Sequence, residues 1–245
     1  MKKVPYIHNT LIHNTRAAQE IVPRIIELFN PKSVVDVGCG IGTWLSVFKE
    51  KGIEDILGID GDFVNQNRLT ISVENFLPSD LEKKFQINRK FDLALSLEVA
   101  EHLRPESADT YIESLTSLSD IIIFSAAIPG QGGQNHLNEQ WPDYWEKKFR
   151  SRGFISYDNF RTEFWENQKI EWWYRQNILL YAKVDNLNLV EKTPLRFVHP
   201  ELFLNKNDEI KVLRKELVTL KDGPGIIFSL KLLAKSIINK FKGLN

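Results

Sequence analysis

The sequence predicts an α/β protein built around a doubly wound sheet, and three observations support this fold class. Short apolar runs of strand length alternate with segments of helical periodicity from residue 16 to residue 184. The first apolar run, residues 33–37, leads through a glycine-rich turn into a helical pattern, which is the start of a βαβ unit. With 245 residues, the chain is long enough for one large domain and an appended segment.

The elements of this sheet can be assigned along the chain from their apolar periodicity. Residues 16–29 place apolar side chains on one face and predict an amphipathic helix, which Pro31 ends. Strands are expected at residues 33–37, 56–60, 71–73, 91–97, 121–124, 154–158 and 178–184. Helices are expected at residues 44–51, 81–85 and 139–152. The stretch from 160 to 174, which carries several Trp residues, is too irregular to assign.

Beyond residue 184 the pattern changes, which predicts a main domain at residues 1–184, with an N-terminal helical cap, and an extension at residues 185–245. The extension has a short helical stripe with spacings of three, four and three: Ile210, Leu213, Leu217 and Leu220. Residues 226–241 predict a second helix with a broad apolar face flanked by lysines. This helix can pack on the main domain, form a homodimer or contact an anionic membrane surface through residues 225–242, and periodicity leaves these alternatives open.

Composition and charge restrict the partners and the compartment. Lys and Arg together number 32, as do Asp and Glu, so the net charge is zero and no nucleic-acid partner is expected.

The single Cys39 excludes an internal disulfide and a cysteine-based zinc site. Its place between two turn glycines indicates a small buried side chain that fills space. The N-terminus lacks a signal-peptide pattern, and no window of 18 uncharged apolar residues occurs. We expect a cytoplasmic protein, peripheral at the inner membrane face if the terminal helix binds there.

The glycine-rich turn after the first strand is the first candidate binding site. Gly38, Gly40 and Gly42 let the backbone turn sharply and let a ligand approach where a Cβ atom would obstruct it. Asp60, at the end of the second apolar run, can accept hydrogen bonds from both hydroxyls of a ribose. Asp36 would repel a phosphate but suits a cationic or amino-bearing ligand. The residues therefore indicate a nucleoside ligand without a phosphate.

This motif resembles the donor-binding motif of class I S-adenosylmethionine-dependent methyltransferases. The resemblance implies S-adenosylmethionine as cofactor and a Rossmann-like sheet of seven strands, the last antiparallel, with helices on both faces. It also implies donor contacts at the ends of the strands, from Asp36, Gly38, Gly40, Gly42, Trp44, Asp60, Gly61, Asp62, Asp80, Leu81, Leu97 and Glu98. The alternative for the turn alone is the strand-turn-helix of another α/β protein.

Two of the acids in this set have a second interpretation. Asp62 can help to hold the ribose, or it can cap a short helix that follows it. Asp80 and Leu81 resemble the element that meets the adenine amino group in methyltransferases of this class. Asp80 can equally be the N-cap of the helix expected at residues 81–85, and one residue can serve both purposes.

Polar side chains follow the expected fourth strand, whose end should open into the binding crevice of a doubly wound sheet. On a helix, Glu98, Glu101 and His102 would share one face, while His136 comes from a Pro- and Gly-rich loop expected to be mobile and to close over a substrate. Methyl transfer to a hydroxyl requires alignment, exclusion of water and removal of a proton. The catalytic candidates are His102 or His136 as general base, together with Glu101. The structural alternative is that Glu101 and His102 only pair to hold the helix.

The pattern Glu98-x-x-Glu101-His102 with a later His136 also resembles the metal-binding set of the small-RNA 2′-O-methyltransferases of the plant HEN type. Two carboxylates and two imidazoles suit a divalent ion, Mg²⁺ or Mn²⁺, that orients ribose hydroxyls. This resemblance covers only the four residues named.

A wider resemblance extends from Ser33 to Tyr181. It rests on four segments: Ser-Leu-Glu-Val-Ala-Glu-His-Leu, Phe-Ser-Ala-Ala-Ile-Pro-Gly-Gln-Gly-Gly, His-Leu-Asn-Glu-Gln-Trp-Pro-Asp-Tyr-Trp and Trp-Trp-Tyr-Arg-Gln-Asn. These segments look like a bacterial methyltransferase group associated with surface-polysaccharide and capsule biosynthesis. The resemblance implies a sugar or sugar-phosphate acceptor, methylated on a hydroxyl or a phosphate-type oxygen. Aromatic side chains at residues 160–174 are compatible with sugar stacking, although Trp more often lies in a core.

Two alternatives to a glycan methyltransferase are open. One is a metal-assisted ribose or small-molecule O-methyltransferase, and the other is a non-catalytic nucleotide-binding subunit that assembles a complex.

Overall fold

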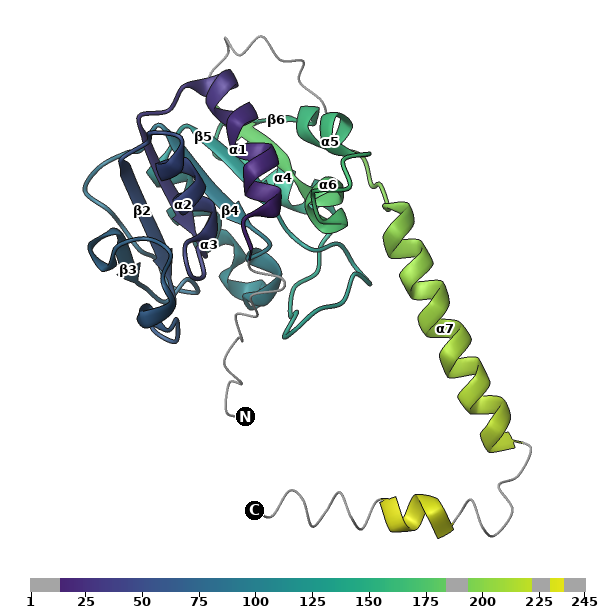
Figure 1. The fold of residues 1–245 in the computed structure, drawn as a ribbon. Helices are drawn as coiled ribbons and strands as arrows, with labels where there is room; N and C mark the ends of the chain where they lie inside the picture. The colour runs from purple at the N-terminus through teal and green to yellow at the C-terminus, as the bar shows by residue number, and fades with distance from the viewer. Residues whose placement is uncertain (1–13, 184–193, 222–229, 236–245) are drawn as a thin grey trace. The chain divides into compact units, whose positions relative to one another are not determined.

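The computed structural model describes residues 14–183, 194–221 and 230–235 (Figure 1). The chain divides into two units, residues 1–199 and residues 200–245. The first unit continues past residue 184, the predicted end of the main domain, because the segment before His199 is bonded to it. The backbone N–H of His199 donates to Gln176 Oε1 at 2.8 Å, and Arg161 Nη1 donates to the Leu195 carbonyl at 3.0 Å.

The first unit contains one seven-stranded sheet in the order β3-β2-β1-β4-β5-β7-β6. Its strands are β1 (Ser33–Val37), β2 (Asp55–Asp60), β3 (Phe76–Pro78), β4 (Leu93–Leu97), β5 (Ile121–Ser125), β6 (Ile155–Tyr157) and β7 (Leu179–Ala182). β1 pairs in parallel with β2 and β4, whereas β7 runs antiparallel to both of its neighbours, β5 and β6. The predicted seven-stranded sheet with an antiparallel last strand is therefore confirmed.

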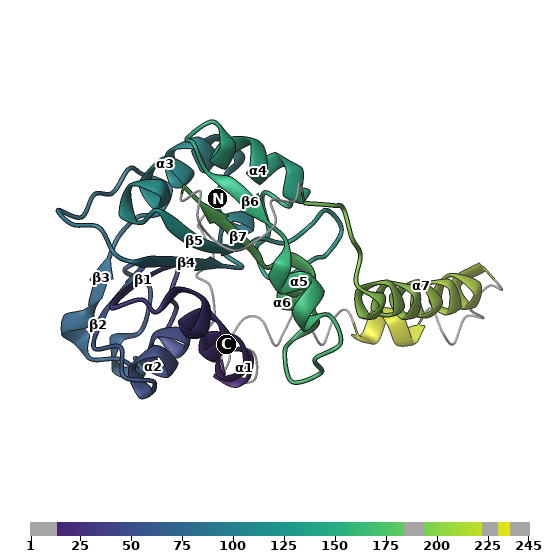
Figure 2. The same cartoon turned by 90° about the horizontal axis from the view of Figure 1, so that it is seen from above.

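Helices cover both faces of the sheet, as predicted (Figure 2). α1 (Arg16–Phe29) and α2 (Thr43–Glu50) lie on one face, and α3 (Ala108–Leu118) and α4 (Pro142–Arg150) lie on the other. Each face has its own apolar core: Ile21 of α1 and Phe48 of α2 pack in one cluster, and Tyr111 and Phe149 in the other. Two short helices, α5 (Asn159–Phe164) and α6 (Trp172–Asn177), occupy the stretch that the sequence left unassigned.

The third strand is predicted wrongly. The apolar pattern predicts it at residues 71–73, but Val73–Asn75 form a 3-10 helix and β3 begins at Phe76. Ile71 is buried because it packs in the core against the glycine turn: a Cβ atom on Gly42 would come within 2.8 Å of Ile71 Cγ1. The apolar character of Ile71 therefore reflects a core-facing loop position and not a strand.

Two predicted helices also differ from the structure. Residues 81–85 form a turn instead of a helix, and the Asp80 side chain accepts a hydrogen bond from the Glu82 backbone N–H at 3.1 Å within it. α4 begins at Pro142 and not at residue 139, since proline is favoured in the first turn of a helix, where its missing N–H leaves no bond unmade.

The second unit contains α7 (Pro200–Lys221), which includes the predicted stripe of apolar residues, and a helical segment at residues 230–235. Most of the predicted helix at residues 226–241 lies outside the described residues. Within the described ranges, the structure has no helix that is both long and apolar enough to cross a membrane.

Candidate active site

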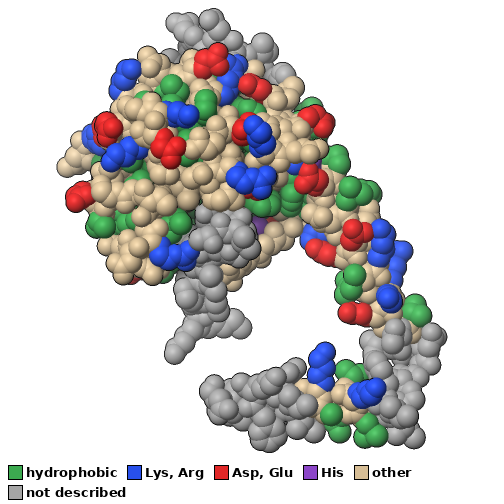
Figure 3. Space-filling view, in the orientation of Figure 1, with side chains coloured by type: hydrophobic (Ala, Val, Ile, Leu, Met, Phe, Trp, Pro, Cys, Tyr) green, Lys and Arg blue, Asp and Glu red, His purple; other side chains and the backbone are tan. Residues whose placement is uncertain are grey.

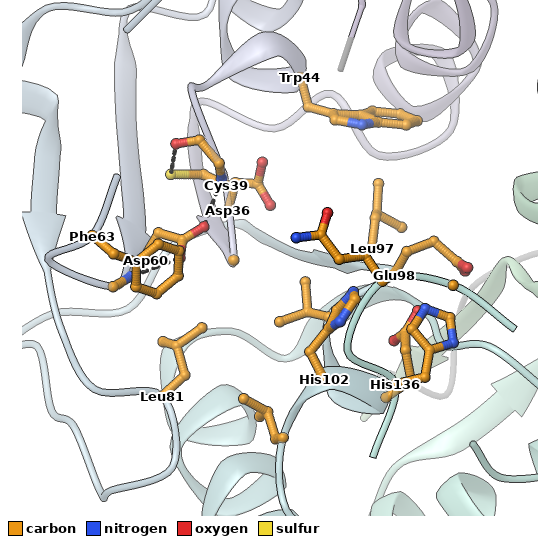
Figure 4. Close-up of a pocket in the computed structure, with 18 of the residues that line it drawn as sticks. Asp36, Cys39, Trp44, Asp60, Phe63, Leu81, Leu97, Glu98, His102 and His136 are labelled. Carbon is orange, nitrogen blue, oxygen red and sulfur yellow. Dashed lines mark hydrogen bonds between the residues drawn. The ribbon is translucent and has the colours of Figure 1, made fainter. Parts of the chain in front are cut away.

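A cavity of about 1140 Å³ opens at the carboxyl ends of β1, β2 and β4 (Figure 4). This is the edge at which ligands bind in open parallel sheets. All but one of the predicted site residues line it: Asp36, Gly38, Gly40, Trp44, Asp60, Gly61, Asp62, Asp80, Leu81, Leu97, Glu98, Glu101, His102 and His136. Gly42 is the exception, and it lies at the start of α2 behind the turn.

The glycine turn has the geometry that the sequence predicts. Gly38, Gly40 and Gly42 all have positive φ values, of 84°, 55° and 87°. These values favour glycine, because residues with a Cβ atom are strained there. A Cβ atom on Gly38 would also come within 2.3 Å of Val99 Cγ2, so glycine is required there on steric grounds as well.

Asp60 at the end of β2 fixes this turn from the opposite side. Its Oδ2 accepts a hydrogen bond from the Gly40 backbone N–H at 2.7 Å, and its Oδ1 accepts one from Gly61 at 2.6 Å. Burial raises the pKa of Asp60 to about 6, although the two backbone bonds act in the opposite direction. Since a carboxylate can accept up to about four hydrogen bonds, both oxygens keep capacity for hydroxyls of a ligand in the cavity.

Asp36 in β1 is a second buried acid beside the turn. Burial, with a smaller contribution from the charge of Asp60, raises the pKa of Asp36 to about 7. A cationic or amino-bearing ligand would relieve this repulsion, whereas a phosphate would increase it. The chemistry predicted for the turn therefore agrees with its electrostatic environment.

Glu98 does not lie on a helix with Glu101 and His102, so that prediction is wrong. It follows β4 with a left-handed φ of 54°, and the 3-10 helix begins only at Ala100. Its carboxylate accepts hydrogen bonds from Asn177 Nδ2 at 3.1 Å and Gln131 Nε2 at 3.0 Å. Burial raises the pKa of Glu98 to about 7 despite these bonds.

Sequence reasoning missed the amide side chains around Glu98, of which that of Gln131 lines the cavity. Gln131 Oε1 accepts hydrogen bonds from Asn177 at 3.0 Å and from Gln176 at 3.1 Å. The network thus joins the end of β4, the loop before α4 and the end of α6. A signal is present in the segment Trp-Trp-Tyr-Arg-Gln-Asn, whose last two residues supply two of these amides.

Glu101, His102 and His136 come together as one cluster, with ligand atoms all within 4.8 Å of one another. The two imidazole rings meet edge to face with centroids 4.8 Å apart (Figure 4). The Glu101 side chain is fully buried, and within the described part of the chain neither carboxylate oxygen has a hydrogen bond of ordinary geometry. Burial, and then the charge of Glu98, raise the pKa of Glu101 well above its ordinary value.

A fully buried carboxylate that accepts no hydrogen bond of ordinary geometry from the described residues, and that lies beside two imidazoles, fits a divalent cation. Of the four predicted metal ligands, the structure brings together Glu101, His102 and His136. Glu98 is not part of this group of ligand atoms, and its carboxylate is held in the amide network.

The loop that carries His136 is docked by specific hydrogen bonds. The Glu101 carbonyl accepts from the backbone N–H groups of Leu137 at 2.7 Å and Asn138 at 2.9 Å. Glu139 accepts from the backbone N–H groups of Gly130 and Gly132, both at 2.7 Å, and lies 2.8 Å from His136 Nδ1. Burial acts to raise the pKa of Glu139, but the bonds to His136 and the two amides outweigh it and lower the pKa.

Aromatic residues form another part of the cavity lining. Trp172, Trp173 and Tyr174 of α6 are half-buried and line the cavity together with Trp44 of α2. Trp44 and Tyr174 pack edge to face with centroids 5.3 Å apart, which fixes this side of the cavity.

The remaining predicted contacts lie at the rim. Asp62 is exposed beside Phe63, whose ring is 51% exposed. Asp80 pairs with Lys83 at 3.1 Å and holds the turn after β3, while Leu81 is buried next to it. The N-cap interpretation of Asp80 is wrong, since no helix follows; its side chain caps a turn that faces the cavity.

Comparisons with known proteins agree with this fold. A family model described as a methyltransferase domain matches residues 11–168, which is more than half of the chain. No protein of curated function matches the sequence.

Three solved structures illustrate the similarity of fold. CalS10, an amino pentose methyltransferase from Micromonospora echinaspora, was solved with S-adenosylmethionine bound; it is 12% identical over 75% of this chain and 100% of its own, with a TM-score of 0.54. DesVI from Streptomyces venezuelae is 13% identical over 69% of this chain and 92% of its own, with a TM-score of 0.53. The methyltransferase domain of a bacterial Hen1, CtHen1-C, is 16% identical over 68% of this chain and 97% of its own, with a TM-score of 0.50.

The residues at the strand ends fit the methyl donor that this family uses. Asp36, Asp60 and the glycine turn line the cavity, where the two carboxylates can accept hydrogen bonds from hydroxyl and amino groups of a ligand. The non-catalytic interpretation is therefore set aside. The chain belongs to the methyltransferase-domain family and is a class I S-adenosylmethionine-dependent methyltransferase.

Proposed function

We propose that this enzyme transfers the methyl group to a hydroxyl oxygen of a sugar or sugar phosphate. The observation that carries the proposal is the pair His102 and His136, whose rings meet in the cavity that Asp36 and Asp60 also line. A hydroxyl acceptor must lose a proton during methyl transfer, and an imidazole is well suited to take it near neutral pH. The similarity of fold to an amino pentose methyltransferase supports an acceptor of sugar size.

His136 is the better placed of the two bases. Because Glu139 is ionised, the contact of 2.8 Å at Nδ1 places the ring proton there and leaves Nε2 as the proton acceptor. A Cβ atom on Gly133 would lie 2.2 Å from Nε2, so only glycine fits beside this nitrogen without displacing the ring. His102 orients the ring of His136 through their edge-to-face contact.

The remaining residues position the reactants and exclude water. The bound donor supplies an activated methyl group on a sulfonium, so the protein needs to align the acceptor and not to activate a leaving group. Trp172 and Trp173 offer half-buried apolar rings on which a pyranose can stack. The loop carrying His136 closes one side of the cavity through its bonds to the Glu101 carbonyl.

The biological setting follows from the similarity of four sequence segments to methyltransferases of surface-polysaccharide and capsule biosynthesis. We infer that the acceptor is a surface glycan or its precursor and that the enzyme works in the cytoplasm, or at the inner face of the membrane.

A metal-assisted O-methyltransferase is the second candidate function, favoured by one observation. The buried Glu101 carboxylate lacks a hydrogen bond of ordinary geometry from the described residues and lies beside His102 and His136. These three residues would hold a Mg²⁺ or Mn²⁺ ion, which would orient and polarise adjacent hydroxyls of the acceptor.

The proposal is tested in two steps. Calorimetry should first show binding of S-adenosylmethionine, with and without Mg²⁺ or Mn²⁺. Transfer of a labelled methyl group should then be measured against nucleotide sugars, oligosaccharides and surface-polysaccharide extracts, with ribonucleosides and small RNA as comparison acceptors. A product methylated on a sugar oxygen supports the proposal. Transfer only to nitrogen, or only to RNA, would contradict it.

A further inference from the structure

α7 presents a line of apolar side chains. Phe203, Ile210, Leu213 and Leu217 are between 44% and 62% exposed. A scattered exposed leucine is ordinary on a protein surface, but a continued line along one helix indicates a contact surface. Figure 3 shows that apolar and charged side chains of both signs are interspersed along this helix.

The line has the period of a coiled coil. Its positions alternate by three and four residues along the sequence, and Lys206 is the one charged residue among them: Phe203, Lys206, Ile210, Leu213, Leu217 and Leu220. This is the a and d pattern of a heptad repeat, with Ile210 at an a position and Leu213 at the next d position. Only the central heptad has the combination that favours two strands, with the β-branched Ile210 at a and Leu213 at d, because the other a positions are Phe203 and Leu217. A helix of 22 residues provides about three heptads and is roughly 33 Å long.

The charges beside the line distinguish between the two possible orientations. Glu209 occupies a g position and Arg214 the following e position. In a parallel pair, g of one helix faces e of its partner five residues later, so that Glu209 meets Arg214. In an antiparallel pair, g faces g and e faces e, so that like charges would meet. Within one chain Glu209 pairs with the exposed Lys206 at 3.1 Å, a weak contact that can be exchanged.

The same charges argue against a lipid surface as the occupant of this face. Along α7, five basic residues stand beside four acidic ones: Lys206, Lys211, Arg214, Lys215 and Lys221, with Glu201, Asp208, Glu209 and Glu216. An anionic membrane attracts helices whose polar face is clearly basic, and this helix is nearly neutral.

We propose that α7 of two copies of the chain forms a parallel, two-stranded coiled coil, so that the methyltransferase is a homodimer. The occupant of the apolar line is therefore the same line of a second copy, in register. This inference is independent of the acceptor and of the metal.

The first test is the mass of the full-length protein in solution, measured by light scattering after size exclusion. The expected mass is twice that of the 28.4 kDa chain. Leu213→Glu should reduce it to a monomer. Val212→Glu is the matched control, since Val212 is 57% exposed beside Leu213 at 62% but lies at an outer heptad position. A wild-type monomer, or a dimer that survives Leu213→Glu, would overturn the proposal.

The second test concerns orientation and register. Ile210→Cys and Leu217→Cys should each form a disulfide between copies under mild oxidation, because a parallel pair places identical a positions opposite each other. The single native Cys39 is buried and should give no background cross-link. Failure of both variants to cross-link would exclude the parallel register.

A charge exchange provides an independent readout. Glu209→Lys should raise the dissociation constant of the dimer by roughly fivefold. Adding Arg214→Glu should restore the wild-type value, because positions 209 and 214 then again carry charges of opposite sign. Binding of S-adenosylmethionine should be the same in every variant, which confirms that the first unit is folded. If the wild-type protein is a monomer and floats with vesicles of anionic phospholipid, the dimer proposal is wrong and the apolar line of α7 binds a membrane surface.

Discussion

His102 and His136, which come from different loops, meet edge to face with their ring centroids 4.8 Å apart. One ring is fixed on the 3-10 helix after β4, and the other is held by Glu139. Replacing His136 by alanine should lower kcat by about 10² to 10⁴, the usual contribution of a general base. The dissociation constant of the donor should not change. Initial rates of labelled methyl transfer and calorimetry measure the two quantities.

Leu137→Ala is the control for that prediction. Leu137 is the next residue on the same loop and is 54% exposed, and its backbone contributes to docking the loop. The methyl-transfer activity of Leu137→Ala should remain close to that of the wild type. Equal losses in both variants would mean that His136 only supports the loop.

Metal binding should depend on Glu101 and not on Glu98. We expect Mn²⁺ to bind to the wild-type protein. Glu101→Gln should weaken the affinity for Mn²⁺ by at least about tenfold, because loss of a direct metal ligand should cost more than loss of a residue that only supports a ligand. Glu98→Gln should keep the affinity, because the carboxylate of Glu98 lies in the amide network. Calorimetric titration with Mn²⁺ measures both. Unchanged methyl transfer in an excess of chelator would reject the metal-assisted function.

Donor affinity should decrease as the pH falls below about 6. The ionised carboxylate of Asp60 is the form that accepts ribose hydroxyls, and burial raises its pKa to about 6. Asp60→Asn should weaken donor binding by roughly 10- to 100-fold, corresponding to the loss of charge-assisted hydrogen bonds. It should also remove this pH dependence. Calorimetry between pH 5 and pH 8 tests both effects. If the variant keeps the pH dependence of donor binding, a group other than Asp60 is responsible for it.

The unliganded protein should become less stable as the pH rises from about 4 to about 7. The pKa of Asp36 is 3.8 in its unperturbed state and about 7 when folded, so within this window the folded state binds more protons than the unfolded state. The free energy of unfolding therefore falls with pH and levels off above the folded pKa. Asp36→Asn should flatten this slope, by an amount on the order of a few kcal/mol. Urea denaturation across the pH range provides the measurement.

Gly38→Ala should abolish donor binding and destabilise the fold, since its Cβ atom would lie 2.3 Å from Val99 Cγ2. Gly52→Ala is a matched control, because Gly52 has a φ of 91° but no atom within 4 Å of the position that a Cβ atom would take. That variant should lose only about 1 kcal/mol, the cost of the left-handed backbone. Thermal unfolding and donor calorimetry should separate the steric effect from the conformational one.

Much of the donor side could be predicted because its signals are local. The apolar run at residues 33–37, the alternating glycines and Asp60 lie within one βαβ unit, and each has a direct physical reason for its residue type. The short edge strand β3 could not be predicted, since three residues ending in Pro78 leave no alternation to detect. Ile71, buried in a loop, gave a stronger apolar signal than the strand itself.

The part of the cavity around Glu98 and the two imidazoles was predictable only in part because its contacts are distant in sequence. Asn177 lies 79 residues after Glu98, and no spacing rule joins them. The left-handed backbone of Glu98 removes it from the helix face that i, i+3, i+4 spacing predicts. The pairing of His102 with His136 depends on how the loop between β5 and α4 is docked, which periodicity does not describe.

The bonds from Leu137 and Asn138 to the carbonyl of Glu101 involve only main-chain atoms. The carbonyl of Glu101 thus anchors the loop beside His136, while the side chain of the same residue lies next to the two imidazoles. Because main-chain bonds are indifferent to the side chain, residue 101 can be changed without breaking these two loop bonds. A substitution at residue 101 therefore changes the chemistry of the cluster while the backbone that holds the loop beside His136 stays in place.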